Sequence, residues 1–331
     1  MRAARPKTGK TLKIFGIAVV AASVLVGSFM VSKLLPEYQE AQESNKAFAK
    51  YRDKVKEKTD SSPSTVETKA EKDEYGLFGD SVQVSQPVMD IPWDDFKGTD
   101  IIAWIQMDNI SYPVMKSWGQ KDDEGQDLYL RHLPDKTYAV SGSIFIYDKN
   151  NPLLTDQSTF IYGHNMMSDT MFGSLKHYTS DDFRDHQFCV YLPNGTRHTY
   201  QFFSENIVPQ SSNLYTWAFA SDDSFLSWQN RLQENSLIHS SLSPSKNAHF
   251  VTMSTCSGYA GTTKRLMITG MEVRCELTGK KASWYDKYKT KLDKQEQSSR
   301  HEVDEHVEAI LDSRRKAVEA EAAKRHAKAS E

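Results

Sequence analysis

The sequence predicts a mainly β protein, a mixed or antiparallel β-barrel with helices inserted between its strands. Between residues 77 and 276, aromatic and β-branched residues recur in short runs that are separated by turn signals. Regular helical segments do not alternate with these runs, which argues against a doubly wound parallel sheet. The barrel class accommodates many short strands of this kind.

The N-terminal segment has the composition of a membrane anchor. Residues 1–13 carry basic side chains and no acidic one, and Ile14 to Val31 contain no charge. An apolar run of this length is close to what a helix needs to cross a bilayer, and a basic flank favours the cytoplasmic side. We expect a cytoplasmic segment at 1–13, an uncleaved transmembrane signal anchor at 14–35, and the remaining chain outside the cell. The alternative is a cleaved signal peptide, whose apolar core is usually shorter.

A polar stretch follows, which we expect to act as an extracellular stalk or linker over residues 36–76. Its first half can form a helix with Glu-to-Lys pairs at spacings of three and four. Its second half is rich in Ser, Thr, Glu and Lys and is typical of a loose linker.

The catalytic domain is expected over residues 77–278. Strands are predicted within 142–148, 158–164, 187–208, 249–256 and 265–273, and the segment 93–107 is expected to be partly helical. Asn194–Gly195 lies between two apolar runs and predicts a hairpin turn. A helix is predicted from Asp222, with Phe225, Trp228 and Leu232 on one face.

The last segment, 279–331, is expected to be a charged helical extension. Its residues favour a helix and most are polar. The sequence leaves open whether this helix is merely solvated or binds a partner.

Charge and cysteine content exclude several classes of function. The net charge is −3, and no basic patch with interleaved aromatic residues suggests a nucleic-acid partner. Three widely spaced cysteines do not form a disulfide framework or a zinc motif, so no metal and no cofactor are expected. One disulfide between Cys189 and Cys275 stays open, beside the alternative of two buried free thiols. The segment HEVDEH places His301 and His306 five residues apart, not the four that a zinc protease requires.

Two strand ends carry the residues that could perform chemistry. Cys256 ends the run HFVTMST, and after a glycine-containing loop Arg265 begins another extended run. A hairpin would bring these two residues together, where a guanidinium favours a thiolate and can stabilise an oxyanion. A cysteine nucleophile also needs a base, and His164 stands at the exit of the strand-like run TFIYG. The residues alone leave a buried cysteine and a surface histidine as the alternative.

Three segments resemble the class B sortases of Gram-positive bacteria. They are SGSIFIYDKNN, FIYGHNMMSDTMFGSLKHY and TMSTCSGYAGTTKR, and the resemblance covers about residues 90–275, with a helical insertion near 222–235. The family signature T-L-x-T-C stands here as Thr252-Met253-Ser254-Thr255-Cys256. The resemblance implies a closed β-barrel of about eight strands, with His164, Cys256 and Arg265 as catalytic residues. It also points to Ser254, Thr255 and Tyr162 as substrate-binding residues. Some relatives have an acidic residue after the cysteine, whereas Ser257 follows here.

The resemblance implies a transpeptidase that cuts a C-terminal sorting signal. The expected partners are secreted or pilin proteins that bear such a signal, a lipid-linked peptidoglycan precursor or a pilin lysine as acceptor, and the lipid bilayer. The sequence does not distinguish wall anchoring from pilus polymerisation. Two other readings stay open: a secreted cysteine endopeptidase that hydrolyses its thioester, and a non-catalytic, membrane-anchored assembly scaffold. A papain-like enzyme is not expected, because His164 precedes Cys256.

Overall fold

The computed structural model describes residues 28, 32, 35, 38–58, 84–258, 262–294 and 316. The chain divides into two units, residues 1–280 and 281–331. In the second unit a helix covers residues 285–294, and most of the remainder of the predicted charged helix lies outside the described residues.

The membrane anchor predicted at residues 14–35 lies almost wholly outside the described residues. In the part of the chain that the structure does describe, no helix is both long and apolar enough to cross a membrane.

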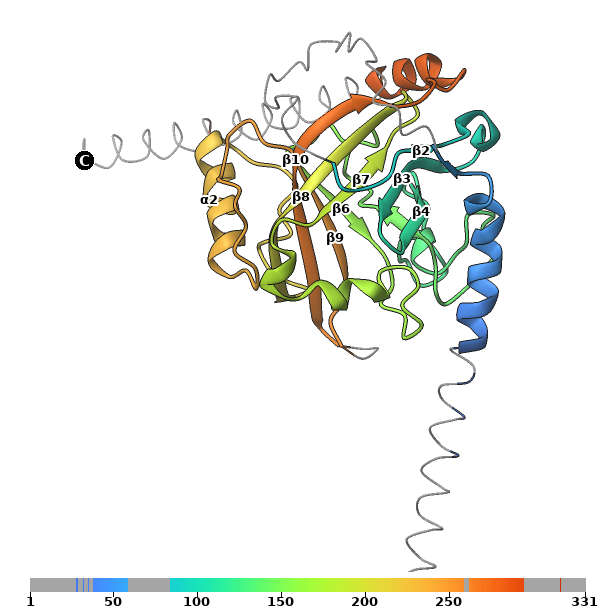
Figure 1. Ribbon diagram of the computed structural model, residues 1–331, viewed down its shortest axis with the longest axis horizontal. Helices are drawn as coiled ribbons and strands as arrows, with labels where there is room; N and C mark the ends of the chain where they lie inside the picture. Colours follow the sequence, from blue (N-terminus) through green and yellow to red (C-terminus); the bar gives the residue numbers. More distant parts are fainter. Residues whose placement is uncertain are drawn as a thin grey trace, which may run out of the picture. The chain divides into compact units, whose positions relative to one another are not determined.

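Eight strands form a closed barrel in the order β10-β8-β7-β3-β4-β5-β6-β9 (Figure 1). The pairs β4–β5 and β6–β9 are parallel and the other pairs are antiparallel. This mixed barrel confirms the predicted fold class. The strands are β3 (Ile101–Met107), β4 (Ile110–Met115), β5 (Ile144–Ile146), β6 (Ser158–Tyr162), β7 (Gln187–Tyr191), β8 (Thr196–Pro209), β9 (Phe250–Cys256) and β10 (Lys264–Leu277).

Short elements decorate the barrel. A two-stranded sheet joins β1 (Lys56–Glu57) to β2 (Met89–Asp90). Four 3₁₀ helices lie in the connections: η1 (Trp93–Phe96), η2 (Leu128–Leu130), η3 (Gly173–Tyr178) and η4 (Asp181–Phe183). The segment 93–107 is thus helical only in η1 and then enters β3, which confirms a partly helical segment.

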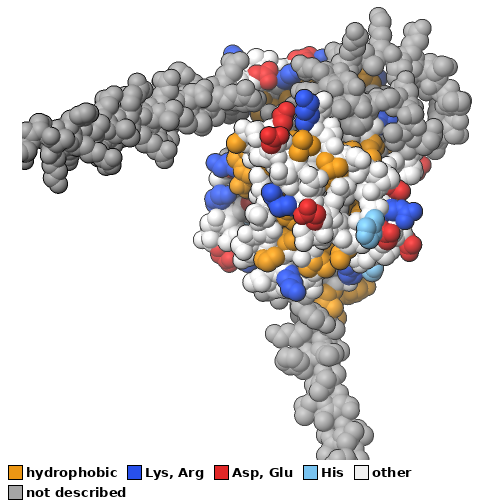
Figure 2. Space-filling view, turned by 90° about the vertical axis from the view of Figure 1, so that its left-hand side faces the viewer, with side chains coloured by type: hydrophobic (Ala, Val, Ile, Leu, Met, Phe, Trp, Pro, Cys, Tyr) orange, Lys and Arg blue, Asp and Glu red, His pale blue; other side chains and the backbone are white. Residues whose placement is uncertain are grey.

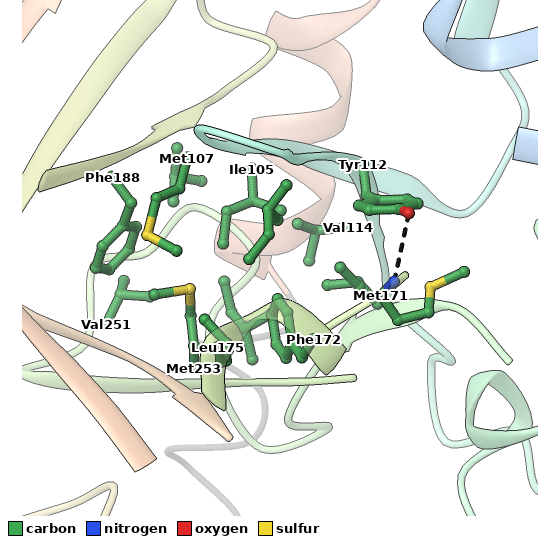
Figure 3. Packing of buried hydrophobic residues seen from close by; sticks show 14 of the residues in the cluster. Ile105, Met107, Tyr112, Val114, Met171, Phe172, Leu175, Phe188, Val251 and Met253 are labelled. Carbon is green, nitrogen blue, oxygen red and sulfur yellow. Dashed lines mark hydrogen bonds between the residues drawn. The ribbon is translucent and has the colours of Figure 1, made fainter. Parts of the chain in front are cut away.

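The interior of the barrel is filled by apolar side chains from most of its strands (Figure 3). Ile105 and Met107 from β3 face Phe188 from β7 and Met253 from β9, and all four are less than 1% exposed. The segment after β6 closes one side with Met171, whose backbone N–H donates to the Tyr112 hydroxyl at 3.3 Å. This contact holds the segment that follows β6 against β4.

The predicted hairpin and inserted helix are both present. Gly195 adopts a positive φ of 88° in the turn between β7 and β8, a conformation that glycine allows without strain. Helix α2 (Asp222–Glu234) begins with a capping box between Ser221 and Ser224. Phe225 and Trp228 of this helix pack edge-on against Phe250 of β9, outside the barrel's interior cluster.

A helix over residues 38–52 packs against the barrel, although the sequence predicted a stalk or linker over 36–76. Phe48 is fully buried and meets the Tyr112 ring edge-on at 5.4 Å. Ser44 and Ser141 share a buried hydrogen bond of 2.6 Å, and Lys50 pairs with Asp135 at 2.9 Å. Because an amphipathic helix gains stability by burying its apolar side, this part of segment 36–76 belongs to the folded unit.

The surface carries mixed charge. Figure 2 shows one face on which acidic and basic side chains are interspersed, with hydrophobic side chains between them. This agrees with the net charge of −3.

Candidate active site

The candidate nucleophile Cys256 and the candidate oxyanion binder Arg265 face each other across two strands. They are direct partners in the antiparallel pair β9–β10. The N–H of Ser257 donates to the carbonyl of Lys264 at 3.0 Å, so the neighbouring pair is the hydrogen-bonded one. Cys256 and Arg265 therefore form a non-hydrogen-bonded pair, the kind whose side chains lie closer together, with Cα atoms about 4.5 Å apart. The predicted hairpin juxtaposition is confirmed.

His164 follows strand β6, which pairs in parallel with β9. It lies at the same end of the barrel as Cys256. Strands β6 and β9 pair in register up to Tyr162 and Ser254. Beyond that point the N–H of Gly163 still donates to the Ser254 carbonyl at 3.2 Å. Because the parallel strands end together and β10 begins there, His164, Cys256 and Arg265 all lie at one rim of the barrel.

Asn165, which is not among the residues predicted from the sequence, connects the loop after His164 to strand β9. Its side-chain amide donates to the Cys256 carbonyl at 2.9 Å and to the Gly258 carbonyl at 3.2 Å. The contact holds the residues next to His164 against β9. A polar residue directly after a strand exit is a weak signal, and only the tertiary pairing reveals its partner.

The His164 ring is oriented by a backbone carbonyl. Its Nε2 lies 2.8 Å from the carbonyl oxygen of Leu130 in η2. A carbonyl only accepts, so Nε2 carries a proton and the neutral ring has its lone pair on Nδ1. Burial lowers the pKa of His164 below its ordinary value, and this outweighs the opposing effect of the Leu130 hydrogen bond. The ring is thus mostly neutral at pH 7 and ready to accept a proton.

The Arg265 guanidinium is fixed by acceptors on two segments. It donates through Nη1 to the Thr262 carbonyl at 2.7 Å and to the Lys264 carbonyl at 3.1 Å. Its Nη2 donates to Oε1 of Gln210 at 3.0 Å. A guanidinium held in this way loses little further side-chain entropy when it binds an anionic group.

A hollow of about 250 Å³ lies beside Arg265. Its lining includes the aromatic residues Tyr147, Tyr162, Tyr215 and Trp217 and the polar residues Gln210 and Arg265. The Tyr162 and Tyr215 rings stack at 6.5 Å, and Trp217 is 37% exposed. An aromatic hollow with a few polar groups is typical of a ligand-binding site.

Ser254 and Thr255 lie beneath the rim instead of on it. Their exposed fractions are 2% and 3%, because both belong to the buried part of β9. Ser254 shares a 2.7 Å hydrogen bond with the Tyr215 hydroxyl and so positions a ring that lines the hollow. Within the described residues, Oγ1 of Thr255 is buried without a hydrogen-bond partner. Of the three predicted substrate-binding residues, Tyr162 is the one that lines the hollow.

The three cysteines are free thiols. Cys189 is buried, as one sequence alternative expected, whereas Cys275 is exposed because it lies near the end of β10. No disulfide joins them.

Comparison with known proteins matches the same region of the chain. The family model of the Sortase domain matches residues 105–273, just over half of the sequence. Sortase B of Staphylococcus aureus is 25% identical over 179 residues, which make up 53% of this chain and 71% of that protein. Sortase B of Listeria monocytogenes is 28% identical over 160 residues, which make up 47% of this chain and 63% of that protein.

Solved structures of sortase B are also similar. The structure of Clostridium perfringens sortase B is 27% identical, with a TM-score of 0.47, and the match covers 53% of this chain and 94% of that one. A Staphylococcus aureus sortase B–substrate complex is 25% identical, with a TM-score of 0.47, and the match covers 53% and 80%.

Proposed function

The chain belongs to the sortase family and is similar to class B sortases, and from this premise we propose that it is a cysteine transpeptidase. Its substrate is a C-terminal sorting signal of a secreted protein, which it cleaves and transfers to an amine. The observation that carries the proposal is the pairing of Cys256 with Arg265 at the rim where His164 leaves β6.

Cys256 attacks a peptide carbonyl of the sorting signal. Nδ1 of His164 accepts the thiol proton, because Nε2 is already committed to the Leu130 carbonyl. The same hydrogen bond supports the imidazolium that results. His164 then gives its proton to the departing amine, which leaves a thioester on Cys256.

Arg265 stabilises the charge that develops on the substrate oxygen. Its guanidinium stands opposite Cys256 and is held by Gln210, Thr262 and Lys264. A donor that is in place before the reaction stabilises the oxyanion without reorganisation.

The aromatic hollow beside Arg265 binds the side chains of the sorting signal that precede the scissile bond. Tyr162 and Trp217 supply apolar area, and Gln210 supplies polar contacts to the peptide backbone. Ser254 acts through Tyr215 by holding its hydroxyl.

An amine, not water, resolves the thioester. The acceptor is an amine of a lipid-linked cell wall precursor or a pilin lysine, and both acceptors present the same nucleophile. We place the chain in the membrane as a single-pass protein with a cytoplasmic N-terminus, on the basis of the charge-free apolar run at 14–31 within the predicted anchor 14–35. Protease treatment of intact cells tests this topology: degradation of only the basic N-terminus would contradict it.

Transfer is tested by incubating the full chain in membranes with a peptide library of sorting signals and a small amine, then weighing the products. The expected product is the peptide fragment joined to the amine, formed by the unaltered chain and by Cys189→Ser but not by Cys256→Ala. Cleaved peptide without amine would identify an endopeptidase. Unchanged activity of Cys256→Ala in surface assembly would identify a scaffold.

A further inference from the structure

A second cysteine with an ordered histidine and carboxylate lies far from the candidate active site. Cys275 pairs with His198 across β10 and β8, and its Sγ lies 3.8 Å from His198 Nε2. Nδ1 of the same histidine lies 2.7 Å from Oε1 of Glu272. Cys275 lies ten positions after Arg265 on β10, so the two sites are about 30 Å apart along the strand. Figure 1 shows β8 and β10 as long strands that run from one end of the barrel to the other.

A β-bulge creates this cluster. Residues three apart on a regular strand point to opposite faces, yet Glu272 and Cys275 both meet His198. The register of β10 against β8 shifts between Glu272 and Arg274, so Val273 is the extra residue. The bulge turns Glu272 and Cys275 to the same face, which is the re-aiming that bulges produce.

The hydrogen bonds require a doubly protonated His198. Thr196 donates its hydroxyl proton to Oδ1 of Asn194 at 2.6 Å, so its oxygen accepts from His198 Nε2 at 2.9 Å. Nδ1 faces a carboxylate, which also accepts. Burial opposes the charged ring, but the Glu272 carboxylate and the hydrogen bonds to Cys275 and Glu272 raise the pKa of His198 to about 10.

Two arginines and one glutamate lie close to the cluster on β8 and β10. Arg197 and Arg274 both bind Glu276, on the opposite face of the two strands. Tyr200 is fully buried, and its pKa lies well above the ordinary value, so it stays neutral. Cys189 is buried, and burial raises the pKa of its thiol. The His198 ring is the charged group in contact with the Cys275 sulfur.

We propose that Cys275 is a second reactive thiol of this chain, activated by the adjacent His198 ring that Glu272 orients, and a site of reversible mixed-disulfide formation with low-molecular-weight disulfides. Cys275 is exposed, so a small disulfide can reach it. The thiolate attacks one sulfur of the disulfide, a new S–S bond forms, and the old S–S bond breaks. The leaving sulfur departs with the electron pair and takes a proton from water. Attack by another thiol reverses the step.

Metal binding fits the cluster less well. The ligand atoms of His198, Glu272 and Cys275 lie within 4.8 Å of one another. Both ring nitrogens of His198 already donate hydrogen bonds, however, and a metal would have to displace one of these protons. The arrangement of sulfur, imidazole and carboxylate is that of an activated thiol.

The test uses the full chain carrying Cys256→Ala, so that Cys275 is the exposed thiol among the described residues. Oxidised glutathione is the probe, and intact mass with peptide mapping follows the modification of Cys275 at pH 6 and pH 8. The rate should differ less than tenfold between the two pH values. Adding His198→Phe should restore ordinary thiol behaviour, with rates that differ on the order of a hundredfold, as a pKa of about 8.5 implies.

A more conservative substitution, Glu272→Gln, provides a second test if the His198→Phe variant does not fold. Glu272→Gln keeps a hydrogen-bond acceptor but removes the negative charge, and should slow the reaction at pH 6 several-fold. The proposal is overturned if Cys275 reacts with the same pH dependence in all three proteins. It is also overturned if Cys275 resists glutathione while the chain binds Zn²⁺ through His198 and Cys275.

Discussion

The side-chain amide of Asn165 donates to the carbonyl oxygen of Cys256 at 2.9 Å. The residue next to the candidate base thereby holds the backbone of the candidate nucleophile. Asn165 directly follows His164, so this contact helps to fix the base relative to the sulfur.

Replacement of Asn165 by Ala should slow transfer about tenfold while the fold is kept. Two hydrogen bonds to the β9 end are lost, each worth about 1 kcal/mol. Steady-state rates with a sorting peptide measure the effect, and Asn247→Ala, at an exposed asparagine, is the matched control. Equal rates for both variants would show that Asn165 does not position the site.

Replacement of Arg265 by Lys should lower kcat on the order of a hundredfold. Lysine keeps the charge but not the planar fork that binds Gln210, Thr262 and the substrate oxygen together. Lys264→Ala removes a neighbouring exposed cation and serves as the control. A lysine variant that retained full kcat would mean that charge alone suffices at this position.

Replacement of Gly163 by Ala should destabilise the protein by about 1–3 kcal/mol and impair catalysis. A Cβ at this position would lie 2.8 Å and 2.9 Å from two ring carbons of Phe172. Relief of the clash would displace the exit of β6 and with it His164. Thermal unfolding and transfer rates measure both effects.

Gly279 provides a control for the Gly163→Ala variant. Gly279 has no atom within 4 Å of its added Cβ, so Gly279→Ala should leave stability nearly unchanged. Gly163→Ala should cost less stability when Phe172 is replaced by Leu than in the unaltered chain. An equal cost in both backgrounds would rule out the ring as the cause.

Replacement of Glu205 by Gln should stabilise the protein at pH 8 but not at pH 4.5. Glu205 is fully buried, and burial raises its pKa to about 8. Between pH 4.5 and 8 the folded carboxyl stays protonated while the unfolded one ionises, so the unfolded chain binds fewer protons. Stability therefore falls as pH rises through this range, by up to a few kcal/mol. Glutamine does not ionise, so the Glu205→Gln variant should not lose stability in this way.

Unfolding midpoints of Glu205→Gln and of the unaltered chain, compared across pH 4.5 to 8, measure this effect. The difference between them should grow with pH. Glu234→Gln, at an exposed position, should show no such trend. A constant difference for Glu205→Gln would mean that its carboxyl does not titrate in this range.

Local pattern was sufficient to predict most elements of the barrel. Runs of aromatic and β-branched residues marked β6, β9 and β10, the Asn194–Gly195 turn marked the β7–β8 hairpin, and a stripe of Phe225, Trp228 and Leu232 marked α2. These signals are readable because strands and helices repeat their contacts at fixed spacings. The packing of residues 38–52 was not predicted, because the sequence of an amphipathic helix does not show which surface its apolar face contacts.

The sequence alone determined which side chains could react, because only a few strand ends carry a cysteine, a histidine or an arginine. Tertiary structure decided which of them act together. The parallel pairing of β6 with β9 brings His164 beside Cys256, and η2 supplies the Leu130 carbonyl that selects its tautomer. A one-residue bulge gives Cys275 its own histidine and carboxylate at the far end of β10. Such contacts join residues far apart in the chain, and they depend on register and closure, which no local window of sequence contains.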